Sequence, residues 1–306
     1  MKNVAEPKYK LPTRKHLSKT VVPEMYEKVK VKIENILEPV QYVSITTHVW
    51  SSTVNDDYLS ITAHFLDDNY KMQHVCLEVI PFSHESLGKW GLLEKLSYVV
   101  RDNARNMSAT MEKAGFKYVS CFAHTLQLVI KDSVFNQKEG SNVITICRRL
   151  VGHFKDSLKA NKQLKAAHET LHMPQKCMIY DEPTKWNSTC HMLKKFWREE
   201  DHWPFKWLLI EVITEILFIF ENTTLAISYP NVNVGATIPI INSIAASLKE
   251  ICALKGMTND LLASLQRRFG NCEFDQCHAT ATILDACYKT NVFVSNEAVI
   301  AAKQHI

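Results

Sequence analysis

The sequence predicts an α/β domain followed by a large all-helical region, in a chain of 306 residues. Three consecutive runs before residue 81 are rich in β-branched and aromatic residues or alternate apolar with polar residues, which is typical of strands. Shorter apolar runs then alternate with helical patterns to about residue 135. From about residue 142 onward the apolar spacing is almost entirely helical and is interrupted at prolines.

The chain opens with a basic, proline-containing stretch, so residues 1–22 are predicted to form an extended arm. A linker helix is predicted over residues 23–40, because its apolar side chains stand four residues apart. These side chains are Met25, Val29, Ile33 and Leu37.

Three strands are predicted over residues 42–50, 58–66 and 70–80, with a hairpin turn at 67–69. A brief segment over residues 87–96 then leads into the second half of the domain. There, strands are predicted at 96–100 and 118–122, with helices at 103–115 and 124–135.

A meander of three strands followed by alternating helices and strands is the element order of the ribonuclease H-like fold. The sequence therefore predicts a ribonuclease H-like mixed sheet over residues 41–140. A large all-helical insertion and C-terminal region is predicted over residues 141–306.

Polynucleotidyl transferases of this fold hold two metal ions with carboxylates at the ends of the first and fourth strands. Asp102 directly follows the fourth predicted strand and precedes a helix, so it is a candidate metal ligand. The alternative is that Asp102 caps that helix, since Asp is favoured at helix N-termini.

Several ordered blocks resemble the hAT superfamily of transposases, and most closely the zinc finger BED domain-containing proteins descended from them. The first residues also resemble the linker between the zinc finger and the core of these proteins. The blocks cover residues 9–30, 45–65, 99–107, 121–132, 181–189 and 281–289.

This resemblance assigns roles to individual positions. Asp102 matches the second catalytic acid of the family, whereas His48 occupies the position of the first. Cys121 and His124 match a Cys-x-x-His motif that the family places beside its active site. Trp186 matches a tryptophan that the family uses in handling the DNA end.

His48 is the most informative departure from the family pattern, because imidazole is a poor substitute for a carboxylate that bridges two Mg²⁺ ions. Three interpretations remain open: a strand residue without chemistry, an altered metal site, or an error in the sequence. The family's third acid, a Glu, lies in a C-terminal segment beyond the point where this chain ends. We therefore expect a degenerate core that does not cut DNA.

Basic residues are candidates for contacts with DNA. Residues 147–176 contain seven Lys and Arg and only two acidic residues; such a basic segment is most often a solvated helix face, and contact with phosphates is the alternative. The candidate DNA-binding residues are Trp186, Arg148, Arg149, Lys155 and Lys185.

No cofactor is expected in this chain. The resemblance implies Mg²⁺ or Mn²⁺ at an intact core and Zn²⁺ in a BED finger that this sequence lacks. Cys121 and His124 supply only half of a zinc site, since a structural site needs four ligands. A second group without zinc-site spacing is interpreted as coincidence: Cys272, Cys277, His278 and Cys287.

The link over residues 81–96 is shorter than the helix that relatives carry there, and a parallel crossover normally needs a dozen residues or more. We expect this link to be strained. Either the third strand frays at its end, or one face of the sheet stays bare and exposes Val75 and Leu77.

The leading hypothesis is a transposon-derived nuclear protein that binds DNA weakly and without strong sequence preference. Self-association is expected to be impaired, because the chain ends before the family's dimerisation segment. The alternatives are an active hAT transposase subunit and a non-functional transposon remnant. The longest apolar stretch, 207–220, is too short to span a bilayer, so no membrane partner is expected.

Overall fold

A computed structural model shows two compact units, Met1–Ser120 and Cys121–Ile306. The unit boundary falls at residue 120, ahead of the expected end of the core at residue 140, because the helices from Phe122 onward pack within the second unit. The structure describes residues 12–51, 56–81, 86–103, 105–170, 172, 177–182, 185–196, 205–229 and 232–306.

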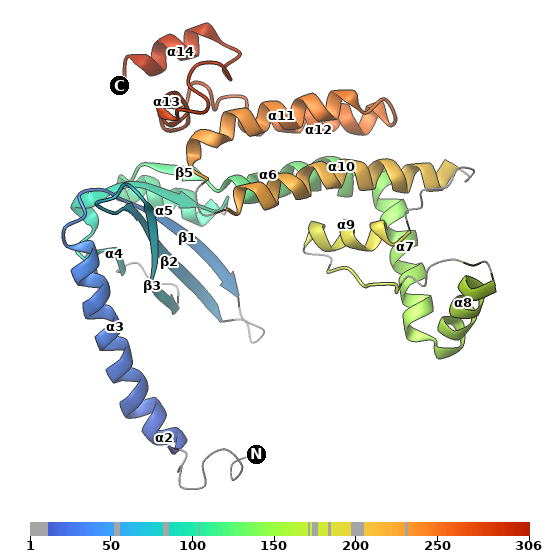
Figure 1. The fold of residues 1–306 in the computed structure, drawn as a ribbon, viewed down its shortest axis with the longest axis horizontal. Coiled ribbons are helices and arrows are strands. Elements are labelled where there is room, and N and C mark those ends of the chain that lie inside the picture. The colour runs from blue at the N-terminus through green and yellow to red at the C-terminus, as the bar shows by residue number, and fades with distance from the viewer. Residues whose placement is uncertain are drawn as a thin grey trace. The chain divides into compact units, whose positions relative to one another are not determined.

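The first unit is built on a five-stranded mixed sheet in the order β3-β2-β1-β4-β5. The β1–β2 and β2–β3 pairs are antiparallel, whereas β1–β4 and β4–β5 are parallel. This topology confirms the predicted ribonuclease H-like fold, and Figure 1 shows β1, β2 and β3 side by side. The strands are β1 Val43–Ser51, β2 Asp57–Leu66, β3 Met72–Pro81, β4 Leu96–Arg101 and β5 Tyr118–Ser120.

The two faces of the sheet differ in burial, because successive side chains of a strand point to opposite faces. On β1, Val43 and Ile45 are fully buried, whereas His48 and Trp50 are exposed. The buried face belongs to a hydrophobic cluster that also contains Leu37, at the end of α3 (Val22–Leu37). Helix α5 (Arg105–Ala114) adds Met107 and Met111 against Val99 of β4.

The short crossover covers the sheet, which corrects the sequence-based expectation. After α4 (Ser86–Lys89), Trp90 and Leu92 insert into the cluster, followed by a 3₁₀ turn, η2 (Leu93–Lys95). Leu77 is therefore only 4% exposed, and β3 stays paired with β2 as far as Pro81. The expectation of a frayed strand or a bare face was wrong, because two large side chains and α3 occupy the space that a longer helix would fill.

The basic arm is also different from its prediction. Residues 14–21 are helical, as α2 (Arg14–His16) and the π-helical η1 (Leu17–Val21), and they run directly into α3. Pro23 stands at the second position of α3, directly after the π-helical turn η1. An extended arm is therefore wrong for residues 14–22, and residues 1–11 lie outside the described part of the chain.

The second unit is all-helical in its described residues. Its long helix α10 (Phe205–Ile227) packs against α6, α7, α9 and α11. Its core joins α6, α7, α9, α10, α11 and α12, as Figure 1 shows for the stacked helices. Among the described helices, none combines the length and apolar character that a bilayer span requires. The remaining elements are α6 Phe122–Ile130, the π-helical η3 Lys131–Phe135, α7 Lys138–Asp156, α8 Leu158–Thr170, α9 Trp186–Lys194, η4 Val234–Ala236, α11 Thr237–Glu250, α12 Lys255–Phe269, α13 Gln276–Leu284 and α14 Asn296–Lys303.

Candidate functional site

The sheet brings the two expected acid positions into register. Thr46 of β1 pairs with Val100 of β4 in the parallel ladder. His48 lies two residues beyond Thr46 on β1, and Asp102 directly follows Arg101, the last residue of β4, so both positions lie at the same end of the two parallel strands. The fold thus places the two candidate positions at one end of neighbouring strands, with an imidazole at one and a carboxylate at the other.

The side chains around His48 are polar or aromatic. His48 itself is exposed, and its carbonyl oxygen accepts a hydrogen bond from the Ser60 hydroxyl at 3.3 Å. On the same face, Trp50 and Tyr58 stack with ring centroids 4.8 Å apart. This exposed aromatic pair escaped the sequence interpretation, because nothing in the spacing indicated that β2 would place Tyr58 opposite Trp50.

The donor set at this position does not fit two Mg²⁺ or Mn²⁺ ions. These hard cations take oxygen ligands, whereas the two candidate positions carry one carboxylate, Asp102, and one imidazole, His48. Within the described ranges, no three His, Cys, Asp or Glu side chains converge closely enough to hold a metal ion. No catalytic step is therefore derived through a metal pair in this chain.

Arg101 fixes the backbone at the end of β4. Its side chain is buried, and its guanidinium donates to the carbonyl oxygen of Asp102 at 2.6 Å. The same guanidinium lies over the Tyr118 ring of β5, 4.6 Å from the centroid. Position 102 is thus held by a side chain that bridges two strands.

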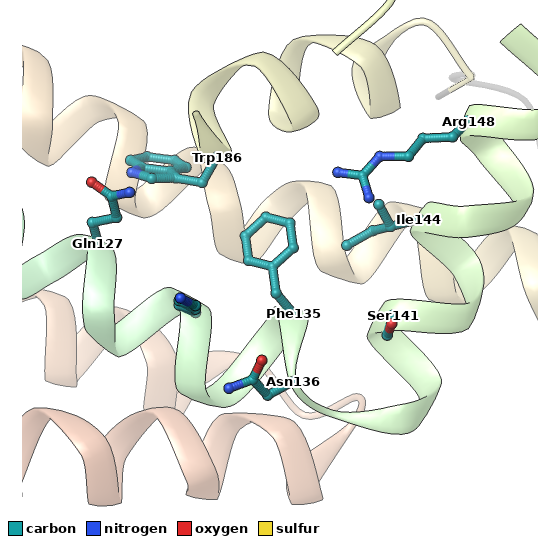
Figure 2. Close-up of a pocket in the computed structure, with 8 residues that line it drawn as sticks. Gln127, Phe135, Asn136, Ser141, Ile144, Arg148 and Trp186 are labelled. Carbon is teal, nitrogen blue, oxygen red and sulfur yellow. The ribbon is translucent and has the colours of Figure 1, made fainter. Parts of the chain in front are cut away.

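The second unit contains a cavity of about 460 Å³ beside Trp186. Its walls come from α6, η3, α7 and the first residue of α9, and Figure 2 shows the Phe135 ring between Trp186 and Ile144. The cavity combines two aromatic rings, two amides and two cationic side chains. The lining residues are Gln127, Lys131, Phe135, Asn136, Ser141, Ile144, Arg148 and Trp186.

Two of the predicted DNA-binding residues, Arg148 and Trp186, therefore share one cavity. Gln127, Lys131 and Asn136 were missed, because single polar residues on an amphipathic helix carry no signal that separates a cavity wall from a solvated face. Trp186 is 9% exposed, so most of its side chain is packed in the core, and the remainder lines the cavity.

Arg148 does not stand alone in the cavity wall. Its Nε donates to both carboxylate oxygens of Asp181, at 3.0 and 2.9 Å, and its Nη2 donates to Oδ2 at 2.6 Å. The Thr189 hydroxyl of α9 donates to the same Oδ2 at 2.8 Å. Burial would raise the pKa of Asp181, but the hydrogen bonds from Arg148 and Thr189 outweigh it and lower the pKa below the ordinary value.

The other predicted basic residues lie on the surface. Arg149 and Lys155 are exposed on α7, and the Lys155 ammonium lies 5.0 Å from the centroid of the Tyr180 ring. Lys185 is exposed at the N-cap position of α9, next to Trp186. Helix α8 continues the basic surface with three exposed lysines, Lys159, Lys162 and Lys165.

Two groups of cysteine and histidine residues were considered as possible zinc ligands. Cys121 precedes α6 and His124 lies in its first turn, and both are partly buried. Burial raises the pKa of Cys272 to about 12 and that of Cys277 to about 11, which disfavours thiolate ligands there. The His278 ring is instead 2.5 Å from the Asp275 carboxylate.

Comparisons with known proteins support the assignment of both units. The ZBED1 RNase-like domain matches residues 46–115, and the ZBED1 RNase-like helical domain matches residues 119–205. Zinc finger BED domain-containing protein 6 of Mus musculus is 25% identical over 94% of this chain and 35% of its own length. Zinc finger BED domain-containing protein 4 of Homo sapiens is 23% identical over 96% of this chain and 28% of its own length.

A plant transposase also matches: the putative AC transposase of Zea mays is 26% identical over 56% of this chain and 24% of its own length. The chain thus spans about a third or less of the relatives that it matches. The topology of the sheet, the matched domains and these relatives agree. The chain belongs to the transposon-derived zinc finger BED domain-containing proteins, which share their core with the hAT transposases.

Proposed function

We propose that this chain is a nuclear DNA-binding protein that has lost the ability to cut DNA. The observation that carries the proposal is the cavity beside Trp186, which aromatic rings and the cations Lys131 and Arg148 line together. Aromatic faces stack on bases and cations neutralise phosphates, so this combination suits a single strand or an unpaired nucleotide. A volume of about 460 Å³ lies in the range of small-ligand sites.

The surface near the cavity supports the same proposal. Arg149, Lys155 and Lys185 are exposed on elements that also form the cavity, and α8 adds further lysines. A cationic surface of this kind attracts the phosphate backbone without reading its sequence. We therefore expect weak binding with little sequence preference, and we place the protein in the nucleus because its ligand is there.

Loss of cleavage follows from the register of the sheet. Position 48, at the same end of the parallel strands as Asp102, carries an imidazole, so the carboxylate that would bridge two cations there is missing. An active transposase subunit is the alternative function, and the retained Asp102 in its expected place is the observation that favours it.

Binding should be measured by fluorescence anisotropy with labelled single-stranded and double-stranded oligonucleotides of mixed sequence. Affinity should fall as salt rises, because phosphate contacts release counterions. Lys131→Glu should weaken binding and lower the slope of log K against log salt by about one. Lys303→Glu makes the same charge change on α14, away from the cavity-lining elements, and should leave affinity nearly unchanged.

Two results would contradict the proposal. Affinity that does not depend on salt would exclude phosphate contacts as its source. Equal weakening by Lys131→Glu and Lys303→Glu would show that net charge, and not the cavity, governs binding.

A further inference from the structure

We infer that Asp181 is a positioning residue: its carboxylate orients the Arg148 guanidinium in the cavity wall and joins it to α9, the helix that begins with Trp186. The inference rests on the proposed function, because it concerns how the same cavity holds a nucleic-acid phosphate. Asp181 itself does not line the cavity.

The exposure of the two partners sets their roles. The Asp181 side chain is 5% exposed, whereas that of Arg148 is 34% exposed. The carboxylate therefore lies inside, behind the guanidinium, and the guanidinium faces the cavity. Figure 2 shows the Arg148 side chain extending from α7 to lie beside Ile144.

The geometry of the pair leaves part of the guanidinium available. A guanidinium has five N–H donors in a rigid, planar fork. Asp181 takes one N–H from Nε and one from Nη2. The remaining three lie on the other edges of the same plane, so the direction in which Arg148 can bind an anion is fixed by Asp181.

Asp181 also joins two walls of the cavity. Thr189, which donates to Asp181, follows Trp186 by about one helical turn in α9. A single buried carboxylate thus sets the orientation of Arg148 relative to the start of α9. Hydrogen bonds that do not involve Asp181 also join the start of α9 to Glu182. The Ser188 hydroxyl accepts from the Glu182 N–H at 2.7 Å and donates to the Lys185 carbonyl at 2.6 Å.

Two physical effects of removing the carboxylate have opposite signs, which makes the inference testable. Charge alone predicts that Asp181→Asn strengthens nucleic-acid binding, because a negative charge near the cavity disappears. Orientation predicts weaker binding, because an unanchored Arg148 must be ordered when the phosphate binds. The entropy cost of ordering one long side chain corresponds to an affinity about threefold to tenfold weaker.

The experiment measures the binding of a fluorescein-labelled single-stranded oligonucleotide to the full chain as a function of salt, with wild-type protein and three variants. Asp181→Asn removes the carboxylate, and Thr189→Val removes one of its hydrogen-bond donors without changing charge. Asp156→Asn is the matched control, since it removes an exposed carboxylate from α7 whose hydrogen-bond partner is the Tyr180 hydroxyl.

We expect Asp181→Asn to bind more weakly and to lose about one unit of salt slope, as Arg148 ceases to contact phosphate. Thr189→Val should weaken binding less, and Asp156→Asn should bind equally well or more tightly. If Asp181→Asn instead lowers the melting temperature and leaves the salt slope of the folded protein unchanged, Asp181 has only a structural role and the inference is overturned.

Tighter binding by Asp181→Asn, equal to that of Asp156→Asn, would also overturn the inference while leaving the proposed function intact. If Asp181→Asn does not fold, Arg148→Lys decides the matter, because it keeps the charge and loses the bidentate geometry. Unchanged affinity and slope in Arg148→Lys would contradict the positioning role. Absence of binding by the wild-type chain would instead refute the proposed function itself.

Discussion

His48 on β1 and Asp102, directly after β4, each stand two residues beyond the paired Thr46 and Val100 of these neighbouring parallel strands. The backbone that would hold two acids side by side is therefore intact, and Arg101 secures it through a hydrogen bond to the carbonyl of Asp102. The side chain at position 48 is one departure from the acid set that the family resemblance implies. A single substitution at this position can therefore probe cation binding.

Replacing His48 with Asp should create a cation site. Two carboxylates on adjacent strands supply the oxygen ligands that Mn²⁺ and Mg²⁺ prefer. We expect Mn²⁺ affinity to rise roughly tenfold over wild type, since added ligand charge tightens such sites. Titration calorimetry with Mn²⁺ would measure this, and His48→Asp combined with Asp102→Asn should return to the wild-type value. No gain in the single variant would show that positions 48 and 102 do not face one another.

Leu92→Ala should destabilise the first unit by about 2–5 kcal/mol, because it empties a fully buried position under the sheet. Leu92 is 2% exposed, whereas its neighbour Leu93 is 50% exposed. Leu93→Ala should therefore change the free energy of unfolding by less than about 0.5 kcal/mol. Urea unfolding followed by circular dichroism would compare them, and equal effects would show that the crossover does not cover the core.

Amide hydrogen exchange offers an independent test of the same crossover. β3 is an edge strand that pairs with β2 from Met72 to Pro81 with one register shift, so those of its amides that bond to β2 should be protected as strongly as the buried residues of β4. Rapid exchange near Pro81 together with slow exchange at Val99 would restore the idea of a frayed strand.

His64 should make the stability of the first unit depend on pH. Burial lowers its pKa from 6.5, and the neighbouring His74 lowers it further. The unfolded chain therefore takes up this proton before the folded chain does as pH falls. The stabilisation is complete above about pH 6.5 and is lost as pH falls toward the folded pKa.

We accordingly expect His64→Gln to flatten the decline of stability below about pH 6.5 in a series of urea titrations. His305→Gln removes an exposed histidine near the end of the chain and serves as the control. If both variants follow the wild-type profile, the pKa of His64 does not contribute to stability.

The strands were predictable because their determinants are local, whereas their order in the sheet was expected from the likeness of the element order to the ribonuclease H-like fold. Alternation placed β2 and β3, and Asp67 between them accepts hydrogen bonds from the backbone N–H groups of Asn69 and Lys71, at 3.0 and 2.9 Å. Such a turn is encoded within five residues and needs no tertiary information.

The features that were missed depend on long-range contacts. Arg148 and Asp181 are 33 positions apart, and nothing in the spacing of either indicated a buried ion pair. Trp90 and Leu92 stand on either side of Gly91 in a segment without clear periodicity. Their burial in the hydrophobic cluster of the first unit could therefore not be predicted from the sequence. The cavity likewise required α6, η3, α7 and α9 to be packed together before its lining could be known.

The most direct test of the whole account is a cleavage assay on labelled duplex DNA with Mg²⁺ or Mn²⁺, run at protein concentrations at which binding is first verified. Binding without any metal-dependent nicking or joining is the predicted result, because the paired-acid site has an imidazole in place of its first carboxylate. Metal-dependent nicking by the wild-type chain that disappears in Asp102→Ala would contradict the account and establish an active enzyme.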